Sequence, residues 1–311
     1  MILIISNNEI DSETDTICKL LLRKSAAFVR LNLDDFISSD CIISSTYFHY
    51  CGMQYLYSQF TKIWIRRSLN FLPKYYNNED FDFQSIIEIN IFQQLEWQKL
   101  LIFFFSKFPS EKMVNSYEGY FITKIDQLKI AEKHQLNPPA SYFSNSIQKV
   151  NSLNFPIIHK PAGNLGYLVK NNFFYASFTE IISKNCAFNN FLPSFFQKKI
   201  TGIFEIRLLY VDEDIYSCGM LKTTTEQNID VKKQKLIRYS PVNISRSFKN
   251  KIKAFMHDIS FRIGVIDIIK SNEGYHFIEM NPIGKFSFYS EMCNFKIEER
   301  IVNLLIEQND P

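Results

Sequence analysis

The chain has 311 residues, of which 46% are hydrophobic and 22% charged, so it can bury a sizeable core and is neither disordered nor collagen-like. The net charge of +3 is too small to indicate a nucleic-acid partner. The longest apolar run, residues 100–105, is far shorter than the roughly 18 residues of a membrane span. The six cysteines form no C-x-x-C pair, so we expect free thiols in a reducing compartment and a cytoplasmic protein.

The N-terminal residues show the pattern of a βαβ unit. Residues 2–5 are an apolar run of strand length. Asp11 supplies an N-cap oxygen for a helix that continues to Lys24, and residues 27–31 are the next predicted strand. A strand, a helix and a second strand in this order predict a parallel sheet.

Aromatic-rich strands and a long helix follow. Residues 42–68 are rich in Tyr, Ile and Trp and are predicted strands that end near the adjacent basic residues Arg66 and Arg67. Apolar residues at helical spacing predict a helix from about residue 80 to residue 107. We predict that the first lobe comprises residues 1–116.

The second predicted lobe, residues 117–198, contains two lysines with informative positions. Thr123 can cap a helix that begins at Lys124, because its hydroxyl can accept a backbone N–H. Lys160 ends an apolar strand and precedes a loop that contains glycine. Residues 195–197 are predicted to form an edge strand that leads into the third lobe.

The third predicted lobe, residues 199–311, begins with an alternating strand at residues 204–210. Residues 222–240 are polar and lack apolar periodicity, so we expect this segment to close over the site as a lid. Residues 244–261 have helical spacing, and residues 264–281 have the pattern of a β-hairpin.

The predicted hairpin brings two carboxylates together. If residues 272–274 form its loop, with glycine in the last position, Ser271 pairs with Tyr275. Counting outward from that pair places Asp267 directly opposite Glu279. Facing carboxylates repel each other unless a cation or a proton intervenes, so this position favours a cation site.

An amide oxygen completes the predicted site. Asn281 lies two residues beyond Glu279 and therefore projects from the same strand face. Oxygen-only ligands suit Mg²⁺, which usually takes substrate phosphates as further ligands. We predict that Asp267, Glu279 and Asn281 bind Mg²⁺. The alternative interpretation is a solvated strand face with no ligand.

Basic residues supply the charge that phosphate needs. Lys124 and Lys160 can act as point charges on phosphate, although a lysine at a strand end is more often a solvated side chain. Glu205 and Arg207 lie two apart on one strand face, and such an arginine can hold an anion bidentately. A cross-strand salt bridge is an equally good interpretation of this pair.

The order of these features resembles the ATP-grasp superfamily over nearly the whole chain. More narrowly, it resembles the ATP-grasp peptide maturases of the grasp-with-spasm type, relatives of the microviridin (graspetide) ligases. The stretches that carry this resemblance are residues 1–7, 63–68, 124–131, 191–207 and 277–294. Its most specific parts are Phe277-Ile278-Glu279-Met280-Asn281-Pro282-Ile283-Gly284 and Cys293-Asn294. Lys232 stands where the family usually has arginine, and Lys285 where glutamine is common.

The resemblance implies a mixed α/β (α+β) fold with a pre-ATP-grasp lobe, a central lobe and a C-terminal lobe with the metal site, clamping ATP between two antiparallel sheets. It implies catalytic roles for Arg207 and Lys160, and one or two Mg²⁺ ions at the three oxygen ligands. The residues that it implies for ATP binding are Lys124, Lys160, Gln197, Lys198, Ile200 and Glu205. Those that it implies for substrate binding are Arg66, Arg67 and Lys232.

The activity that the resemblance implies is ADP-forming carboxylate activation. The substrate is a ribosomal precursor peptide with a leader and a core, whose Asp or Glu side chains become acyl phosphates and are joined to Ser, Thr or Lys as macrocyclic esters or amides. An exposed Trp64 beside Arg66 and Arg67 would suit such an acidic peptide. We expect no nucleic-acid or membrane partner, and a homodimer is left open.

Two other functions compete with peptide maturation. One is an ATP-grasp ligase that adds free amino acids to a peptide or protein, which would raise the product mass instead of removing water. The other is a degenerate, nucleotide-regulated peptide-binding module. The facing carboxylates Asp267 and Glu279 argue against the module, because a non-catalytic descendant has no physical need for them.

Overall fold

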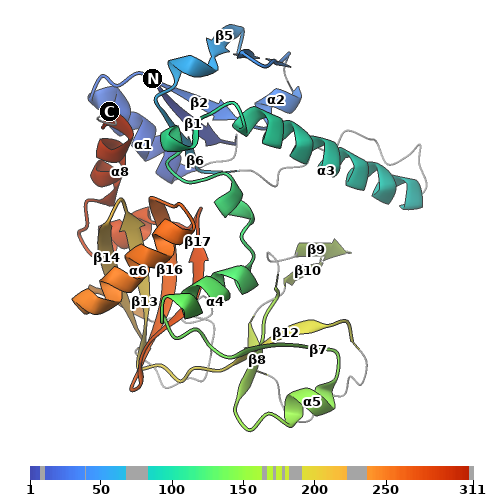
Figure 1. Cartoon of the computed structure of the whole chain (residues 1–311), viewed down its shortest axis with the longest axis vertical. Coiled ribbons are helices and arrows are strands. Elements are labelled where there is room, and N and C mark those ends of the chain that lie inside the picture. Colours follow the sequence, from blue (N-terminus) through green and yellow to red (C-terminus); the bar gives the residue numbers. More distant parts are fainter. Residues whose placement is uncertain are drawn as a thin grey trace.

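The computed structural model describes residues 1–307 except 8–10, 39, 68–82, 163–166, 171–172, 177–178, 182–190 and 223–236. Three bodies of structure are visible in Figure 1, with the first lobe at the top, the C-terminal sheet at the lower left and the central lobe at the lower right. None of the helices within the described ranges has the length and apolar character of a membrane span.

The first lobe is built on a three-stranded parallel sheet with the order β2-β1-β6. The expected βαβ unit is confirmed, because β1 pairs in parallel with both neighbours and Asp11 caps the intervening helix. A small antiparallel sheet, β3-β4-β5, packs its aromatic side chains beside it. The elements are β1 (Ile2–Ser6), α1 (Ser12–Arg23), β2 (Phe28–Asn32), α2 (Asp35–Ser38), β3 (Ile42–Ile43), β4 (Tyr47–Tyr50), β5 (Met53–Leu56), β6 (Lys62–Ile65) and α3 (Phe83–Phe105).

The central lobe contains a four-stranded antiparallel sheet with the order β11-β8-β12-β7 and a separate β9-β10 hairpin. Its elements are β7 (Ser141–Ser144), α5 (Ile147–Asn151), β8 (Ile157–His159), β9 (Tyr167–Lys170), β10 (Phe173–Ala176), β11 (Glu180–Ile181) and β12 (Ser194–Lys198). The predicted edge strand at 195–197 is an interior strand, so that expectation was wrong. Phe195 and Phe196 are both buried because both faces of β12 are covered.

The C-terminal lobe is a five-stranded antiparallel sheet with the order β15-β14-β13-β16-β17. Helices α4 and α6 contribute to the core on one face, and the first lobe and α8 pack against the other. The elements are β13 (Phe204–Val211), β14 (Asp214–Lys222), β15 (Ile237–Pro241), α6 (Arg246–Asp258), β16 (Ile263–Ser271), β17 (Gly274–Asn281), α7 (Ser287–Met292) and α8 (Ile297–Ile306). The predicted strand, helix and hairpin of this lobe are therefore confirmed.

Helix α4 (Lys124–Lys133) begins at the predicted cap residue Thr123, whose hydroxyl accepts the backbone N–H of Asp126. Its buried residues Leu128 and Ala131 join the core of the C-terminal sheet and not the small core of the central lobe. The proposed boundary at residue 117 therefore assigns α4 to the central lobe, although this helix packs on the sheet of the C-terminal lobe. Most of the expected lid at 222–240 lies outside the described residues.

Candidate active site

The β16–β17 hairpin has the predicted carboxylate pair but not the predicted turn. Ser271 pairs with Gly274, so the register near the turn is one residue shorter than expected. A β-bulge between Asp267 and Ile268 then shifts the ladder back, and Asp267 pairs with Glu279 as predicted. The extra residue is Ile278, and it allows Phe277 to face the core while Glu279 faces outward with Asp267.

Arg207 lies beside Asp267 on the neighbouring strand β13. Its Nε and Nη2 each donate to one oxygen of that carboxylate at 2.8 Å, which is the planar, bidentate geometry of an arginine–carboxylate pair. Its Nη1 donates to the Tyr289 hydroxyl at 3.0 Å. Burial alone would lower the pKa of Arg207, but the Asp267 carboxylate raises it above the ordinary value, so the guanidinium is charged.

The second carboxylate, Glu279, faces two lysines from other elements. The Lys124 ammonium at the start of α4 lies 3.6 Å from a Glu279 oxygen and donates to the Pro161 carbonyl at 3.4 Å. Lys160, just after β8, is 6% exposed. The pKa of Lys160 is lowered to about 8: burial is the largest cause and Lys124 acts in the same sense, whereas Glu279 and Asp267 act in the opposite sense.

Gln127 holds Lys124 in this position. The Gln127 amide donates to the Met280 carbonyl at 3.1 Å and accepts the Met280 N–H at 2.9 Å, so one side chain pairs both backbone groups on the free edge of β17. Gln127 is itself buried, and such paired groups are costly to leave unsatisfied. The first turn of α4 is therefore fixed over the strand that carries Glu279.

Asn281 is the exposed member of the predicted ligand set. Its side-chain oxygen accepts the backbone N–H of Ile283 at 3.0 Å and so forms part of the turn that follows β17. No cluster of three His, Cys, Asp or Glu side chains with metal-binding spacing occurs among the described residues. Two facing carboxylates and one amide oxygen remain, and these are the hard oxygen donors that Mg²⁺ prefers.

The residues expected near adenine lie along β12 and the segment after it. Gln197 is 1% exposed; its amide donates to the Ser141 hydroxyl at 2.9 Å, and its Oε1 has no partner among the described residues. Lys198 is exposed, with its ammonium 5.9 Å from the Phe155 ring centroid. Ile200 is half-buried in the connection to β13, and Glu205 is half-buried two residues before Arg207.

The N-terminal basic pair, Arg66 and Arg67, contacts carboxylates of the first lobe. Arg66 is 2% exposed and pairs with Glu13, so it cannot contact a surface peptide in this conformation. Arg67 is more accessible and donates to Asp11 at 2.9 Å. The expected exposed aromatic, Trp64, is 1% exposed, and that expectation was wrong because β6 is covered on both sides. Lys232 lies outside the described residues.

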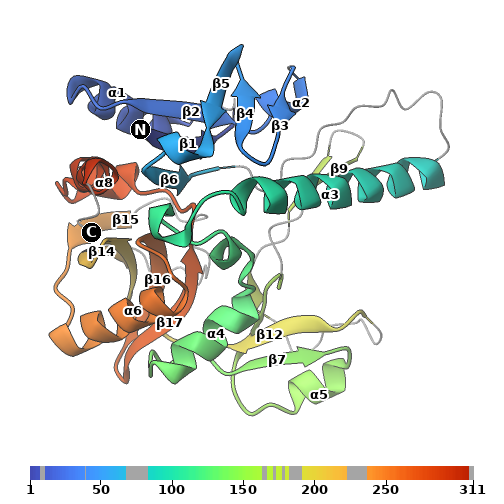
Figure 2. The same cartoon turned by 45° about the horizontal axis from the view of Figure 1, so that its top comes forward.

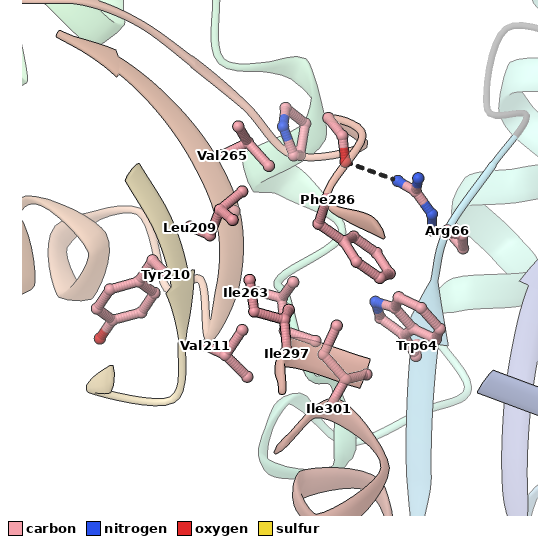
Figure 3. Close-up of a pocket in the computed structure, with 13 residues that line it drawn as sticks. Trp64, Arg66, Leu209, Tyr210, Val211, Ile263, Val265, Phe286, Ile297 and Ile301 are labelled. Carbon is pink, nitrogen blue, oxygen red and sulfur yellow. Dashed lines mark hydrogen bonds between the residues drawn. The ribbon is translucent and has the colours of Figure 1, made fainter. Parts of the chain in front are cut away.

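A small cavity separates β6 from the C-terminal sheet (Figure 3). Trp64, Arg66 and Phe286 line it together with aliphatic residues of β13 and β16. Its volume of about 10 Å³ has room for about one water molecule and none for a nucleotide. This region is consequently a packed seam between lobes and not a ligand pocket.

Solved structures with the same arrangement cover almost the entire chain. A RiPP-associated ATP-grasp ligase from Chryseobacterium gregarium, in complex with ADP and a leader and core peptide, has 19% identity and a TM-score of 0.80 over 99% of this chain and 97% of that one. The macrocyclase MdnC from Microcystis aeruginosa, bound with precursor peptide MdnA, has 17% identity and a TM-score of 0.76 over 98% and 99%. The ATP-grasp ligase PsnB, complexed with minimal precursor, Mg and ADP, has 17% identity and a TM-score of 0.73 over 99% and 96%.

The chain has the ATP-grasp fold. No family model and no curated protein sequence matches it, so the likeness rests on structure. The resemblance deduced from the sequence is confirmed at the level of fold, including the two antiparallel sheets expected to flank ATP.

Sequence reasoning missed three residues in and around this candidate site. Tyr289 contacts Arg207, Gln127 holds α4 on β17, and Glu13 bonds the backbone that leads into α7. Tyr289 and Glu13 are far in sequence from their partners, and no local motif marks them. Gln127 had a partial signal, because a polar residue on the apolar face of a predicted helix needs a hydrogen-bond partner.

Proposed function

We propose that the chain is an ATP-dependent carboxylate ligase that modifies a ribosomally made precursor peptide. The observation that carries this proposal is the convergence of Asp267 and Glu279 with three cations from three different elements, Arg207, Lys124 and Lys160. Carboxylates and cations that lie side by side on a sheet of the ATP-grasp fold suit a reaction that depends on positioning and charge neutralisation. The described site uses no Ser or Cys nucleophile, and the proposed reaction needs none.

ATP and Mg²⁺ are the proposed cofactors, with one or two metal ions. Asp267, Glu279 and Asn281 would hold the metal, which would supply positive charge against the phosphate groups of ATP. Arg207 and Lys124 lie against the two carboxylates and balance their charge. With Mg²⁺ on the carboxylates, either cation would be available to a phosphate group.

The basic residues then have separate proposed roles. Lys124 and Lys160 contact the phosphates, while Gln197, Lys198 and Ile200 line the adenine site, where the unpaired Gln197 oxygen can accept from the adenine amino group. Glu205 lies on the same strand face as Arg207 and completes the nucleotide side of the site. The Arg207 guanidinium holds the reacting carboxylate against the γ-phosphate.

The proposed reaction has two steps. A peptide Asp or Glu carboxylate attacks the γ-phosphate, which gives an acyl phosphate and releases ADP. A Ser or Thr hydroxyl, or a Lys amine, then attacks the acyl carbon; it loses its proton, phosphate leaves, and an ester or amide closes the ring. Because the chemistry uses ATP and a newly synthesised peptide, we propose a cytoplasmic location.

The partner is proposed to be a precursor peptide with a leader and a core. Three of the structurally similar ligases were solved with precursor or leader and core peptides, which supports this class of substrate. Arg67 is the accessible basic residue of the predicted pair and can meet an acidic side chain. Lys232 stays a proposed contact on sequence grounds alone.

A second copy of the chain is the proposed partner of helix α3, which projects from the first lobe (Figure 2). Large apolar side chains are exposed along it, and exposed patches of this kind mark interfaces. They occur toward both ends of the helix, so an antiparallel, two-fold pairing of two α3 helices would bury both sets. The exposed residues are Ile87, Ile91, Phe92, Leu95, Ile102 and Phe103.

The proposed function is tested with Glu279→Gln and Asp267→Asn. We expect each variant to lose peptide-dependent ADP release by several orders of magnitude while the fold persists, because a metal site has lost one charge. Asp258→Asn is the matched control, since Asp258 pairs with Lys133 and His134 on the surface away from the site. Full activity in either site variant would remove the metal assignment.

Product mass separates the proposed reaction from its rival. Each ester or amide formed within the peptide removes one water, whereas addition of a free amino acid raises the mass. The precursor would be the peptide encoded beside this gene that is rich in Asp or Glu and in Ser, Thr or Lys. A mass increase, or ADP release driven by free amino acids without peptide, would replace peptide maturation with amino-acid ligation.

A further inference from the structure

Glu13 connects the first lobe to the short helix α7. It lies in the first turn of α1, is 5% exposed, and its Oε1 accepts the backbone N–H groups of Phe286 at 2.6 Å and Ser287 at 2.9 Å. The cap residue of α7, Phe286, makes no side-chain hydrogen bond of its own to the helix. A carboxylate 273 positions away in sequence therefore takes the place of an ordinary N-cap.

Arg66 pairs with this buried carboxylate and holds it in place. Its Nη2 donates to the other Glu13 oxygen, and its Nη1 donates to the Gly284 carbonyl at 3.4 Å (Figure 3). The guanidinium also lies over the Phe286 ring, 5.3 Å from the centroid. Both members of the pair thus contact the 284–287 segment, which directly follows the strand that carries Glu279.

Helix α7 leads from this anchor back to the proposed site. Tyr289 is its third residue, and its hydroxyl accepts the Arg207 Nη1 N–H at 3.0 Å, with the Arg207 guanidinium 5.0 Å from the ring centroid. Asp267 orients the opposite edge of the same guanidinium. The orientation of Arg207 is consequently set from two sides, by β16 and by α7.

We propose that Glu13 is a positioning residue that fixes the start of α7 and, through Tyr289, sets the orientation of Arg207. Arg66 acts with it as the counter-charge. This makes the first lobe part of the catalytic apparatus, because its carboxylate decides where the guanidinium points. The kinetic part of this inference rests on the proposed ligase function.

Glu13→Gln is the test variant, because it keeps the side-chain size and removes the charge. We expect kcat for peptide-dependent ADP release to fall about tenfold or more, with KM for ATP changed less than about twofold. Asp15→Asn is the matched control: Asp15 lies in the same helical turn, but its carboxylate pairs with Arg30 instead of the backbone at the start of α7. It should leave both constants within about twofold of the wild type.

A double-mutant cycle distinguishes positioning from general loss of structure. If Glu13 acts through Tyr289, then Glu13→Gln combined with Tyr289→Phe should be no slower than the worse single variant by more than about twofold. Losses in kcat that multiply would show that the two residues act independently and would overturn the proposal. Should Glu13→Gln fail to fold, Glu13→Asp retains the charge with a shorter reach and replaces it in the cycle.

Hydrogen exchange gives a reading that needs no turnover. Amides of residues 286–292 should exchange faster in Glu13→Gln than in the wild type and unchanged in Asp15→Asn, because the Phe286 and Ser287 N–H groups lose their acceptor. Equal protection in the wild type and Glu13→Gln would overturn the proposal. A wild-type chain that is inactive on every peptide would instead refute the proposed function and leave this reading intact.

Discussion

Lys160 provides a pH test of the proposed phosphate site. The residue is 6% exposed, and burial, with Lys124 nearby, lowers its pKa to about 8. A side chain with that pKa is about 90% protonated at pH 7 and about 10% protonated at pH 9. The charged form attracts phosphate, so nucleotide affinity should be greatest at pH 7 and below and should fall about tenfold between pH 7 and pH 9.

The assay is calorimetric titration of ATP into the free enzyme at pH 7, 8 and 9. Lys160→Arg should bind with nearly constant affinity over this range, because a guanidinium stays protonated. Lys133→Arg, an exposed change on α4, should keep the wild-type profile. A wild-type affinity that does not change from pH 7 to pH 9, or an equal decline in Lys160→Arg, would refute the assignment of Lys160 to phosphate.

Two further predictions concern packing and assembly. Gly284→Ala should lower the free energy of unfolding by about 1–3 kcal/mol in denaturant titrations, because the added Cβ would lie 2.6 Å from the Val265 Cβ; an unchanged midpoint would contradict this close approach. Ile91→Glu on the exposed α3 face should convert the proposed dimer to a monomer in sedimentation, whereas Glu96→Lys on the same helix should not. A wild-type monomer at micromolar concentration would exclude the α3 dimer.

Local patterns in the sequence were enough for most elements of the ATP-grasp fold. The N-cap residues Asp11 and Thr123 start the helices that they were expected to start, because a cap depends only on residues within one turn. The strand with Arg207 and the hairpin with Asp267 and Glu279 follow from alternation along the chain. Positions two apart share a strand face whatever the fold around them.

The hairpin also shows how a correct pairing followed from an incorrect turn. The true loop is one residue shorter than expected, and the bulged Ile278 adds that residue back before Asp267. Turn chemistry does not determine a bulge several residues away. Packing determines the bulge, because Phe277 is fully buried in the core while Glu279 faces away from it.

Only the tertiary structure decided which side chains are exposed at the surface and which are buried between lobes. Trp64 and Arg66 are residue types that suit a peptide-binding surface, yet both are buried where β6 meets the C-terminal lobe. Glu13 and Tyr289 acquired roles through contacts with distant parts of the chain. The sequence determined each strand and helix through neighbours within a few residues. The contacts of Glu13 and Tyr289 form only when packing of the lobes brings distant segments together, because no local preference encodes them.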